Sequence, residues 1–246
     1  MTHPGIRPPA YRLPDDLSLG RVTLQISHTE RSLAYYQDVL GFRILNREGD
    51  IATLGAQSAS TPLVELREVK GTQAVGRNAK LGLYHFAILL PTRAALGSFV
   101  QHLADIAAQA GSADHLVSEA LYLRDPDGLG IEVYADRPRE TWEFDRQQMK
   151  MATDPLDVAD VIRAAKGAPW TGLPEGTVMG HVHLHVGDID EAAAFYHVGL
   201  GLDKVVWQYP GALFLSAGGY HHHLGVNTWA GRGAPSAGDT DARLVE

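Results

Sequence analysis

The stretch from Gly180 to Val186 carries the strongest chemical signal in the sequence. Histidines alternate with apolar residues along it, in the order Gly180-His181-Val182-His183-Leu184-His185-Val186. This period of two predicts a half-buried strand with the three imidazoles together on one face. Because imidazole nitrogen is a common metal ligand, we predict that one of these histidines binds a metal ion.

The same arrangement of a strand followed by a helix occurs earlier in the chain. The positions of Val182, Leu184, Tyr196 and Gly201 are matched there by Val22, Leu24, Tyr36 and Gly41. The offset is constant at 160 residues, as in 182 against 22 and 201 against 41. A constant offset of this kind indicates an internal repeat.

The repeat determines the expected fold class. Each module reads as a strand, a helix and three further strands, so we predict an α+β protein of about three βαβββ modules. Their curved mixed sheets should pair two modules around a metal cavity. The expected parts are an extended arm at 1–18, module one at 19–70, module two at 81–138, a helical connection at 139–175, module three at 176–230, and at 231–246 a tail or the start of a truncated fourth module.

Turn residues give more local expectations. Helices are expected at 29–40 and 93–110, with Gly41 and Gly111 as their stops. The string Asp125-Pro-Asp-Gly128 lies between two alternating strands and predicts a hairpin. Proline fixes one dihedral angle of such a turn, and glycine permits another that other residues avoid.

Composition restricts the class of partner. The 246 residues are 45% apolar, with a formal charge of -8 at pH 7 and an isoelectric point near 5.8. This offers no basic surface for nucleic acid or membrane, so we expect a small-molecule partner. The sequence has no cysteine, which leaves imidazole and carboxylate as metal ligands, a set suited to zinc, iron(II) or manganese. No leader or membrane-spanning run is visible, so a cytoplasmic location is expected.

Two residues of module two complete a candidate metal site. His85 opens the first strand of module two as His181 opens that of module three, and Glu132 lies in module two's last strand. If both modules face one cavity, these side chains converge and leave coordination positions open, as in non-haem iron(II) sites. The alternative is that each histidine is only packed or hydrogen-bonded in its strand. Equivalent placement in two repeats favours the metal.

Other polar residues leave two interpretations open. Tyr122 lies ten residues before Glu132 and is either a chemical group or a core aromatic whose hydroxyl needs a partner. His115 either takes part in chemistry or caps a turn. The consecutive histidines at 221–223 fall in an expected strand at 221–228 and must put at least one imidazole on each face. An imidazole that faces the core needs a partner or a function.

The module order, the leading histidines and three short strings resemble the vicinal oxygen chelate superfamily. Within it they resemble the catechol 2,3-dioxygenase group of type I extradiol ring-cleaving enzymes. The similarity covers most of residues 19–231, and its strings are Asp125-Pro-Asp-Gly128, Ile131-Glu-Val-Tyr134 and Tyr220-His-His-His-Leu224. Module one departs from the pattern, because Arg21 stands where the other modules have a histidine. The family typically has four modules, whereas this chain has barely more than three.

The resemblance implies a reaction and a cofactor. His85, Glu132 and His181 would hold iron(II), with Mn(II) or another divalent metal as alternatives, and the substrate would be catechol or a related dihydroxylated aromatic cleaved with O2. A metal-dependent isomerase or transferase of the same superfamily is one rival, although it would need a fourth protein ligand. A non-catalytic small-molecule binding protein is the other.

The resemblance also implies roles for residues around the metal. His222 or His115 would take a proton from the substrate and return it later, and Tyr122 would donate a hydrogen bond to the developing oxyanion. His221 or His223 could replace His222 in that role. The residues assigned to substrate contact are His221, His223 and Asn227.

The odd number of modules suggests an interface. We expect modules two and three to face each other, so that module one exposes apolar side chains such as Leu24, Ile26, Leu63 and Leu66. Large apolar patches are rare on monomers. A homodimer joined through module one is therefore expected.

Overall fold

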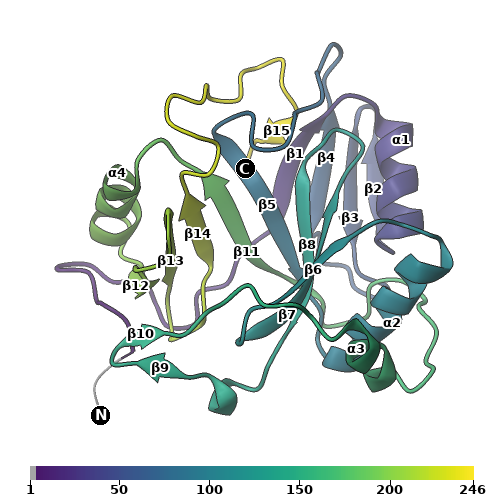
Figure 1. Cartoon of the computed structure of the whole chain (residues 1–246). Coiled ribbons are helices and arrows are strands. Elements are labelled where there is room, and N and C mark those ends of the chain that lie inside the picture. Colours follow the sequence, from purple (N-terminus) through teal and green to yellow (C-terminus); the bar gives the residue numbers. More distant parts are fainter. Residues whose placement is uncertain (1–3) are drawn as a thin grey trace.

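The computed structural model describes residues 4–246 of the protein. Three similar groups of elements follow one another along the chain (Figure 1). The first group contains β1 (Val22–Ile26), α1 (Thr29–Ala34), the π-helical turn η1 (Tyr35–Val39), β2 (Arg43–Glu48), β3 (Ile51–Gly55) and β4 (Val64–Glu68). The second contains β5 (Gly82–Leu89), α2 (Arg93–Asp105), β6 (Gly111–Asp114), β7 (Ser118–Arg124) and β8 (Gly130–Asp136). The third contains β11 (Val178–His185), α4 (Ile189–Ala193), the π-helical turn η3 (Ala194–Gly199), β12 (Asp203–Val206), β13 (Ala212–Ser216) and β14 (Leu224–Asn227).

Shorter elements connect the second and third groups and end the chain. They are the 3₁₀ turn η2 (Arg139–Thr141), β9 (Phe144–Asp145), β10 (Gln148–Met149), α3 (Val158–Ala164) and, last, β15 (Arg243–Leu244). The expected α+β fold of repeated βαβββ modules is confirmed. Within residues 4–246, no helix has the length and apolar character that crossing a membrane requires.

Modules two and three form one continuous sheet of eight strands in the order β12-β13-β14-β11-β5-β8-β7-β6. Its centre is the antiparallel pair β5 and β11, which run side by side in Figure 1. The two modules are therefore joined edge to edge by backbone hydrogen bonds. Figure 1 shows α2 and α3 on the side of module two and α4 on the side of module three.

Module one forms a separate sheet of five strands, in the order β15-β1-β4-β3-β2. One face of β1 is apolar and packs with Leu33, Tyr36 and Leu40 of the following helical segment, in a core cluster that continues into module two. The opposite face is polar, and the last residues of the chain cover part of it: Gln25 Nε2 donates to the carbonyls of Asp239 and Asp241.

The apolar surface expected on module one is not exposed. Leu24, Ile26 and Leu66 are fully buried, and Leu63 is 6% exposed. These side chains point toward their own module's helix and toward module two, because β1 presents its apolar residues to the helix that follows it. The stated reason for a dimer through this surface is therefore wrong.

Three local expectations also need correction. Helix α2 ends at Asp105, five residues before the expected end, where Ala107 takes a left-handed backbone conformation (φ 54°). Gly111 is then the first residue of β6 rather than a helix stop. The residues His221 to His223 precede β14 and do not lie in it, although all three are buried.

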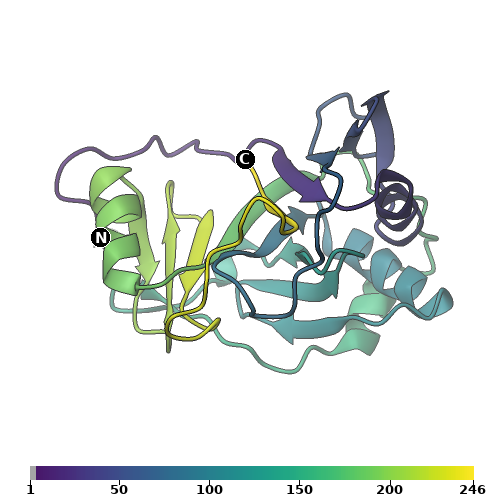
Figure 2. The ribbon, with the colours of Figure 1, turned by 90° about the horizontal axis from the view of Figure 1, so that it is seen from above.

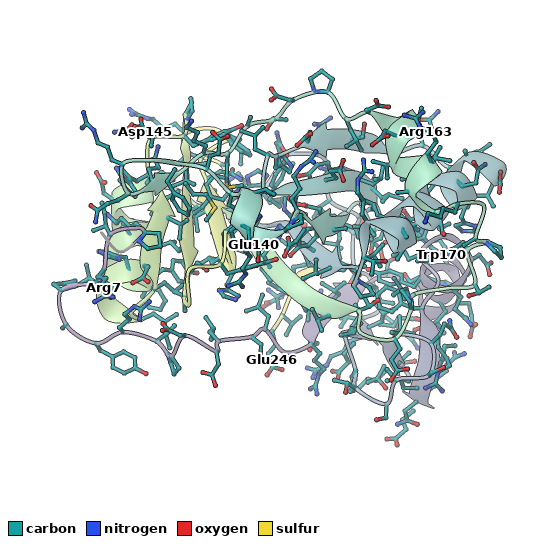
Figure 3. The ribbon with its side chains drawn as sticks, turned by 90° about the horizontal axis from the view of Figure 1, so that it is seen from below. Arg7, Glu140, Asp145, Arg163, Trp170 and Glu246 are labelled. Atoms are coloured by element: carbon teal, nitrogen blue, oxygen red, sulfur yellow. The ribbon has the colours of Figure 1, made fainter. Side chains whose placement is uncertain are left out.

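The N-terminal segment crosses the molecule to module three (Figure 2). Ile6 forms a β-bridge with Lys204, and Arg12 makes an ion pair with Asp203 at 2.7 Å. Figure 3 places Arg7 at the same end of the molecule as Asp145, with Arg163 and Trp170 at the other end.

The turn after β7 ties module two to module one. The expected hairpin is present: Gly128 has φ 84°, and its N–H donates to the Asp125 carbonyl at 2.9 Å. The carboxylate of Asp127 accepts hydrogen bonds from the backbone and the hydroxyl of Ser27, at 2.8 and 2.6 Å. Asp125 accepts from the hydroxyl of Tyr36 in the core of module one. The turn is thus both a hairpin and a contact between modules.

Asp125 gives the stability of this contact a pH dependence. Burial raises the pKa of its carboxyl to about 7, against the opposing hydrogen bond from the Leu129 N–H. An acid whose pKa is higher in the folded state stabilises the protein below its unfolded pKa. That contribution is lost as the pH rises through about 7.

We therefore expect Asp125→Asn, which cannot ionise, to gain stability relative to wild type as the pH rises from about 4 to about 7. The gain should be at most about 1.4 kcal/mol per pH unit, measured as the free energy of unfolding in urea. Asp145→Asn, at an exposed carboxylate, is the control. A difference between Asp125→Asn and wild type that does not change with pH would contradict a buried acid at this turn.

Candidate metal centre and adjoining cavity

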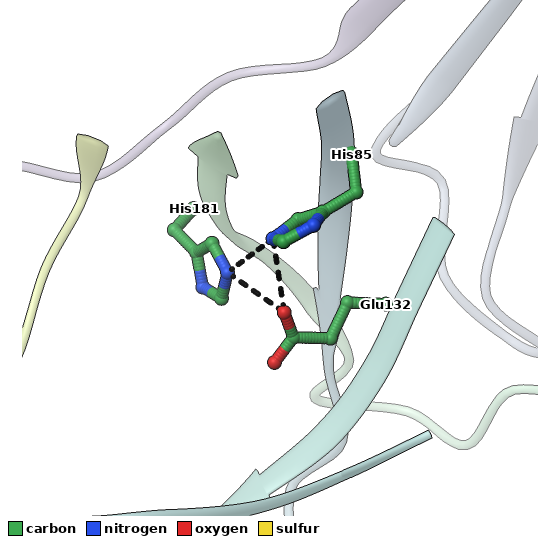
Figure 4. Close-up of side chains that lie close together, drawn as sticks. All are labelled: His85, Glu132 and His181. Atoms are coloured by element: carbon green, nitrogen blue, oxygen red, sulfur yellow. Dashed lines mark hydrogen bonds and ion pairs between the residues drawn. The ribbon is translucent and has the colours of Figure 1, made fainter. Parts of the chain in front are cut away.

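Three ionisable side chains meet at the centre of the eight-stranded sheet (Figure 4). The Nε2 atoms of His85 and His181 are 3.3 Å apart. One oxygen of Glu132, Oε2, lies 3.0 Å from His85 Nε2 and 3.2 Å from His181 Nε2. All three residues are buried. The sequence thus identified a triad that the fold does bring together.

The strand register explains why these residues converge. On β5, Ala87 lies opposite His181 of β11 on one side and opposite Glu132 of β8 on the other. His85 is two residues earlier on β5, so its side chain shares the face of Ala87. Because Ala87 has only a methyl group, His181 and Glu132 can meet above it beside His85.

A glycine next to His181 makes room for the aromatic ring that supports it. A Cβ at Gly180 would overlap the hydroxyl of Tyr134. The Tyr134 ring packs against the His181 imidazole, with ring centroids 5.0 Å apart, and its hydroxyl is hydrogen-bonded to that of Tyr220 at 2.7 Å. His181 Nδ1 is buried and has no partner among residues 4–246. The ring therefore meets the other two members of the triad through Nε2 alone.

The protonation states suit metal binding at neutral pH. Burial lowers the pKa of His181 to about 4, even though the charge of Glu132 acts in the opposite direction. Burial alone would raise the pKa of Glu132, but the charges and hydrogen bonds of His181 and His85 lower it well below the ordinary value. His181 is then neutral and Glu132 ionised, which are the forms that bind metals.

The spacing of the three ligand atoms fits one metal ion. With metal–ligand distances of about 2.1 Å, two ligands at a right angle lie about 3.0 Å apart, and two at a tetrahedral angle about 3.4 Å apart. The observed distances of 3.0, 3.2 and 3.3 Å fall within these limits. Two imidazoles and a carboxylate on one face form the donor set of a facial triad. We conclude that His85, Glu132 and His181 are a metal-binding triad.

A cavity of about 840 Å³ adjoins the triad and gives access to it. Two of the ligands, His85 and Glu132, form part of its wall. The three residues expected to take part in chemistry, His115, Tyr122 and His222, line the same cavity. The fold therefore gathers them around the metal site, although their chemical roles stay predictions.

His115 and Tyr122 are coupled by hydrogen bonds. His115 Nδ1 is 2.6 Å from the carbonyl oxygen of Ala152, which can only accept, so we assign the proton to Nδ1. With the proton on Nδ1, Nε2 is the acceptor for the Tyr122 hydroxyl at 2.5 Å. Burial and the charge of Glu132 raise the pKa of Tyr122 well above its ordinary value. Tyr122 is therefore a protonated hydroxyl on the cavity wall, oriented by His115.

His222 belongs to a second chain of hydrogen bonds. The carboxylate of Asp136 accepts from His221 Nε2 at 2.9 Å. With the His221 proton assigned to Nε2, His221 Nδ1 accepts a hydrogen bond from His222 Nδ1 at 2.8 Å. This leaves Nε2 of His222 unprotonated. Burial, followed by the charge of His181, lowers the pKa of His222 well below its ordinary value, so the ring is neutral.

The residues assigned to substrate contact lie behind the cavity wall. None of His221, His223 and Asn227 lines the cavity, and each is hydrogen-bonded within the protein: His221 to Asp136, His223 to the hydroxyl of Ser216, and Asn227 to two histidines of β11. Neither the cavity wall nor these hydrogen bonds supports direct contact with substrate, which stays a prediction for these positions. Their polar atoms are used to hold the wall together.

The sequence did not single out several cavity residues. His183 lies opposite His85 and receives a hydrogen bond from Asn227 Nδ2 at 2.9 Å. A Cβ at its parallel neighbour Gly225 would crowd the His183 ring. The aromatic part of the wall consists of Tyr84, Tyr209, Phe214 and Trp229, and the wall also contains Arg77 and Arg124. These residues come from several strands and loops of modules two and three, so only the position of His183 in the alternating stretch gave a signal.

Loss of any one ligand should abolish stoichiometric metal binding. We expect His85→Ala, Glu132→Ala and His181→Ala each to lose most of about one bound ion per chain, measured by elemental analysis after anaerobic loading with iron(II). Circular dichroism should show a retained fold. His102→Ala, outside the cavity, is the control. Full metal content in two of the three variants would rule out the triad.

The comparisons with known proteins agree with this geometry. Residues 18–133 match the model of the Glyoxalase/Bleomycin resistance protein/Dioxygenase superfamily. The chain is 47% identical over 224 residues to the catechol-2,3-dioxygenase of Bacillus subtilis (strain 168), covering 90% of this chain and 78% of that protein.

Two solved structures show the same fold. A putative dioxygenase from Bacillus subtilis has a TM-score of 0.56 at 16% identity, covering 88% of this chain, which spans 65% of the length of that structure. Glyoxalase I from Zea mays has a TM-score of 0.51 at 17% identity, covering 91% of this chain and 70% of that one. With its repeated modules, its buried triad and a relative that shares almost half of its residues, the chain belongs to the glyoxalase/bleomycin resistance protein/dioxygenase superfamily.

Proposed function

We propose that the protein is an iron(II)-dependent extradiol dioxygenase that cleaves the ring of catechol or a related dihydroxylated aromatic with O2. The observation that carries the proposal is a buried triad of two imidazoles and one carboxylate beside a cavity lined by proton-handling groups. The similarity to a protein named catechol-2,3-dioxygenase supports the same reaction.

The donor set favours iron(II), although Mn(II) or another divalent metal fits the same three atoms. Three protein ligands on one face leave the remaining positions toward the cavity. When bound there, the metal would bring both oxygens of the diol and dioxygen together in one coordination sphere. All of the remaining functions fall to side chains of the protein.

His222 is the proposed proton acceptor for the substrate. Its Nδ1 donates to His221, so its Nε2 is the basic atom, and no protein partner of Nε2 is found among residues 4–246. The ring contacts His181, with centroids 4.1 Å apart, so a hydroxyl bound at the metal would lie near Nε2. A neutral imidazole next to the reacting oxygen is suited to general base catalysis.

Asp136 and His221 are proposed to position His222. The carboxylate fixes the tautomer of His221, and His221 in turn fixes that of His222. The same logic holds the catalytic histidine of a serine protease in its active tautomer. His221 is thus proposed as a positioning residue and not as a contact of the substrate.

Tyr122 is the proposed hydrogen-bond donor to the negative oxygen that develops on the substrate. Its hydroxyl donates to His115 in this structure, so it must rotate away from His115 in order to donate to the substrate. His115 Nε2 is then free to accept a proton and to return it later. The two residues are thus proposed to act together, as a hydrogen-bonded pair that module two contributes to the cavity wall.

The rivals are less well supported by the site. An isomerase or transferase of the superfamily would use a fourth protein ligand, but within residues 4–246 the cluster of candidate ligands contains three. A protein that only binds a small molecule would not require a buried triad with a neutral His181 and an ionised Glu132, the forms that bind a metal. We also propose a small aromatic diol and O2 as the partners and the cytoplasm as the location. A homodimer stays a prediction, but the buried leucines of module one cannot be its interface.

The direct test is to load the protein with iron(II) under anaerobic conditions, add catechol, and admit air. The expected result is the yellow absorbance of the ring-cleavage product, in proportion to bound iron. Glu132→Ala, treated identically, should give none. Stoichiometric iron and bound catechol without any product would reject the dioxygenase and favour the binding protein.

Substitutions of the two proton-handling residues should separate chemistry from metal binding. We expect His222→Ala and Tyr122→Phe to keep their iron and to lower kcat by about 10- to 1,000-fold, because each loses a proton transfer. Asp136→Asn should lower kcat with little change in KM, since the shortest hydrogen bond of Asp136 is the one that fixes the tautomers of His221 and His222. Unchanged kcat in both His222→Ala and Tyr122→Phe would mean that these side chains only pack in the cavity wall and take no part in proton transfer.

A further inference from the structure

Two arginines on the cavity wall have no acidic partner. Arg77 and Arg124 both line the cavity, and neither forms an ion pair with any carboxylate in residues 4–246. Arg124 makes one hydrogen bond, from Nη1 to the carbonyl of Gly128 at 2.6 Å. Arg93 and Arg137, by contrast, are each paired with two carboxylates. Neither guanidinium on the cavity wall is thus held by a direct ion pair, although Asp125 acts on Arg124 electrostatically.

The strand register places Arg124 close to the proposed chemistry. On β7, Tyr122 lies opposite the ligand Glu132, and Arg124 lies opposite Gly130. Tyr122 and Arg124 are two residues apart and so share one face, with a separation of about 7 Å along the strand. This distance is similar to the length of a substituted benzene ring. A ring held at the metal could reach Arg124 with a substituent.

The surroundings of Arg124 favour an anion. Burial, followed by the charge of Arg77, lowers the pKa of Arg124, but a guanidinium remains charged in proteins. Two neighbouring like charges repel each other, and a bound anion relieves that repulsion. Among the residues that line the cavity, Glu132 is the one carboxylate, and it already belongs to the metal triad.

The space in the cavity exceeds what a bare catechol needs. Its volume of about 840 Å³ lies in the range of about 300–1,000 Å³ that is typical of pockets for drug-sized ligands. Gly130, across the strand pair from Arg124, is also part of the cavity wall. Its backbone packs so closely on β5 that a Cβ would overlap the carbonyl of Tyr84.

We propose that Arg124 and Arg77 form a carboxylate subsite, and that the preferred substrate is a catechol with a carboxylate-bearing side chain. Guanidinium groups bind carboxylates through two parallel hydrogen bonds, which gives both affinity and orientation. The inference rests on the proposed dioxygenase function and names its substrate class. The diol would face the metal while the carboxylate faces the two arginines.

The kinetic test compares 3,4-dihydroxyphenylacetate with its methyl ester, which has the same ring but no charge. In wild type, kcat/KM should be at least about 10-fold higher for the acid. The ratio should fall by about 10- to 100-fold in Arg124→Gln and by a smaller factor in Arg77→Gln. Arg77 is exposed, so the second variant tests the subsite without disturbing the core.

The control is Arg163→Gln, at an exposed arginine of α3 that pairs with Asp160 far from the cavity. It should leave the ratio unchanged. Equal kcat/KM for acid and ester in wild type, or a ratio that Arg124→Gln does not lower, would overturn the subsite. Turnover of catechol itself separates the two proposals: if catechol is cleaved and the acid is not preferred, only the substrate class is wrong.

A binding measurement without metal provides an independent readout. Isothermal titration calorimetry of metal-free protein should show tighter binding of 3,4-dihydroxyphenylacetate than of its methyl ester, and the difference should disappear in Arg124→Gln. If catechol is not cleaved but this charge preference is present, the dioxygenase function fails and the anion subsite stands. Equal affinity for both ligands would overturn the subsite whatever the activity.

Discussion

The antiparallel pairing of β5 with β11 is the interaction on which the rest of the structure depends. It joins two modules into one sheet and sets His181 of one module beside His85 of the other. The register also puts Ala87 between His181 and Glu132, which leaves the space that the three ligands share. A slip by one residue would turn every side chain of β11 to the other face and remove the site.

Burial of this site without a metal costs folding free energy. Three ionisable groups and several further imidazoles are buried together, and burial of charged groups costs free energy unless they are paired. The protein limits this cost by keeping buried histidines such as His181 and His222 neutral. It also orders their protons through acceptors behind the wall, of which Asp136 is the clearest case. A divalent ion would stabilise the folded protein further by compensating the charge of Glu132.

Module one shows what the same fold does without a metal. Glu65 lies opposite Thr23 in the parallel pair β1 and β4, as Glu132 lies opposite Ala87 in β5 and β8. Two residues before Thr23 stands Arg21, in the place of His85. Arg21 and Arg67 both form ion pairs with Glu65, at 3.2 and 2.6 Å. A carboxylate that would need a metal partner in one module is neutralised by arginine in the other.

The sequence by itself determined the repeat, the module fold and the metal triad, because these depend on the local alternation of residues and on a constant offset. His85, Glu132 and His181 could be found since each lies in a strand whose face is readable from its neighbours. It could not determine which face of β1 is covered, where α2 ends, or that His221 lies behind the wall. Those features depend on packing between segments far apart in the chain, such as the contact of Asp136 with His221. The tertiary structure alone gathered Arg77 and Arg124 with the triad, because a cavity wall is formed by strands and loops from several modules and no single segment encodes it.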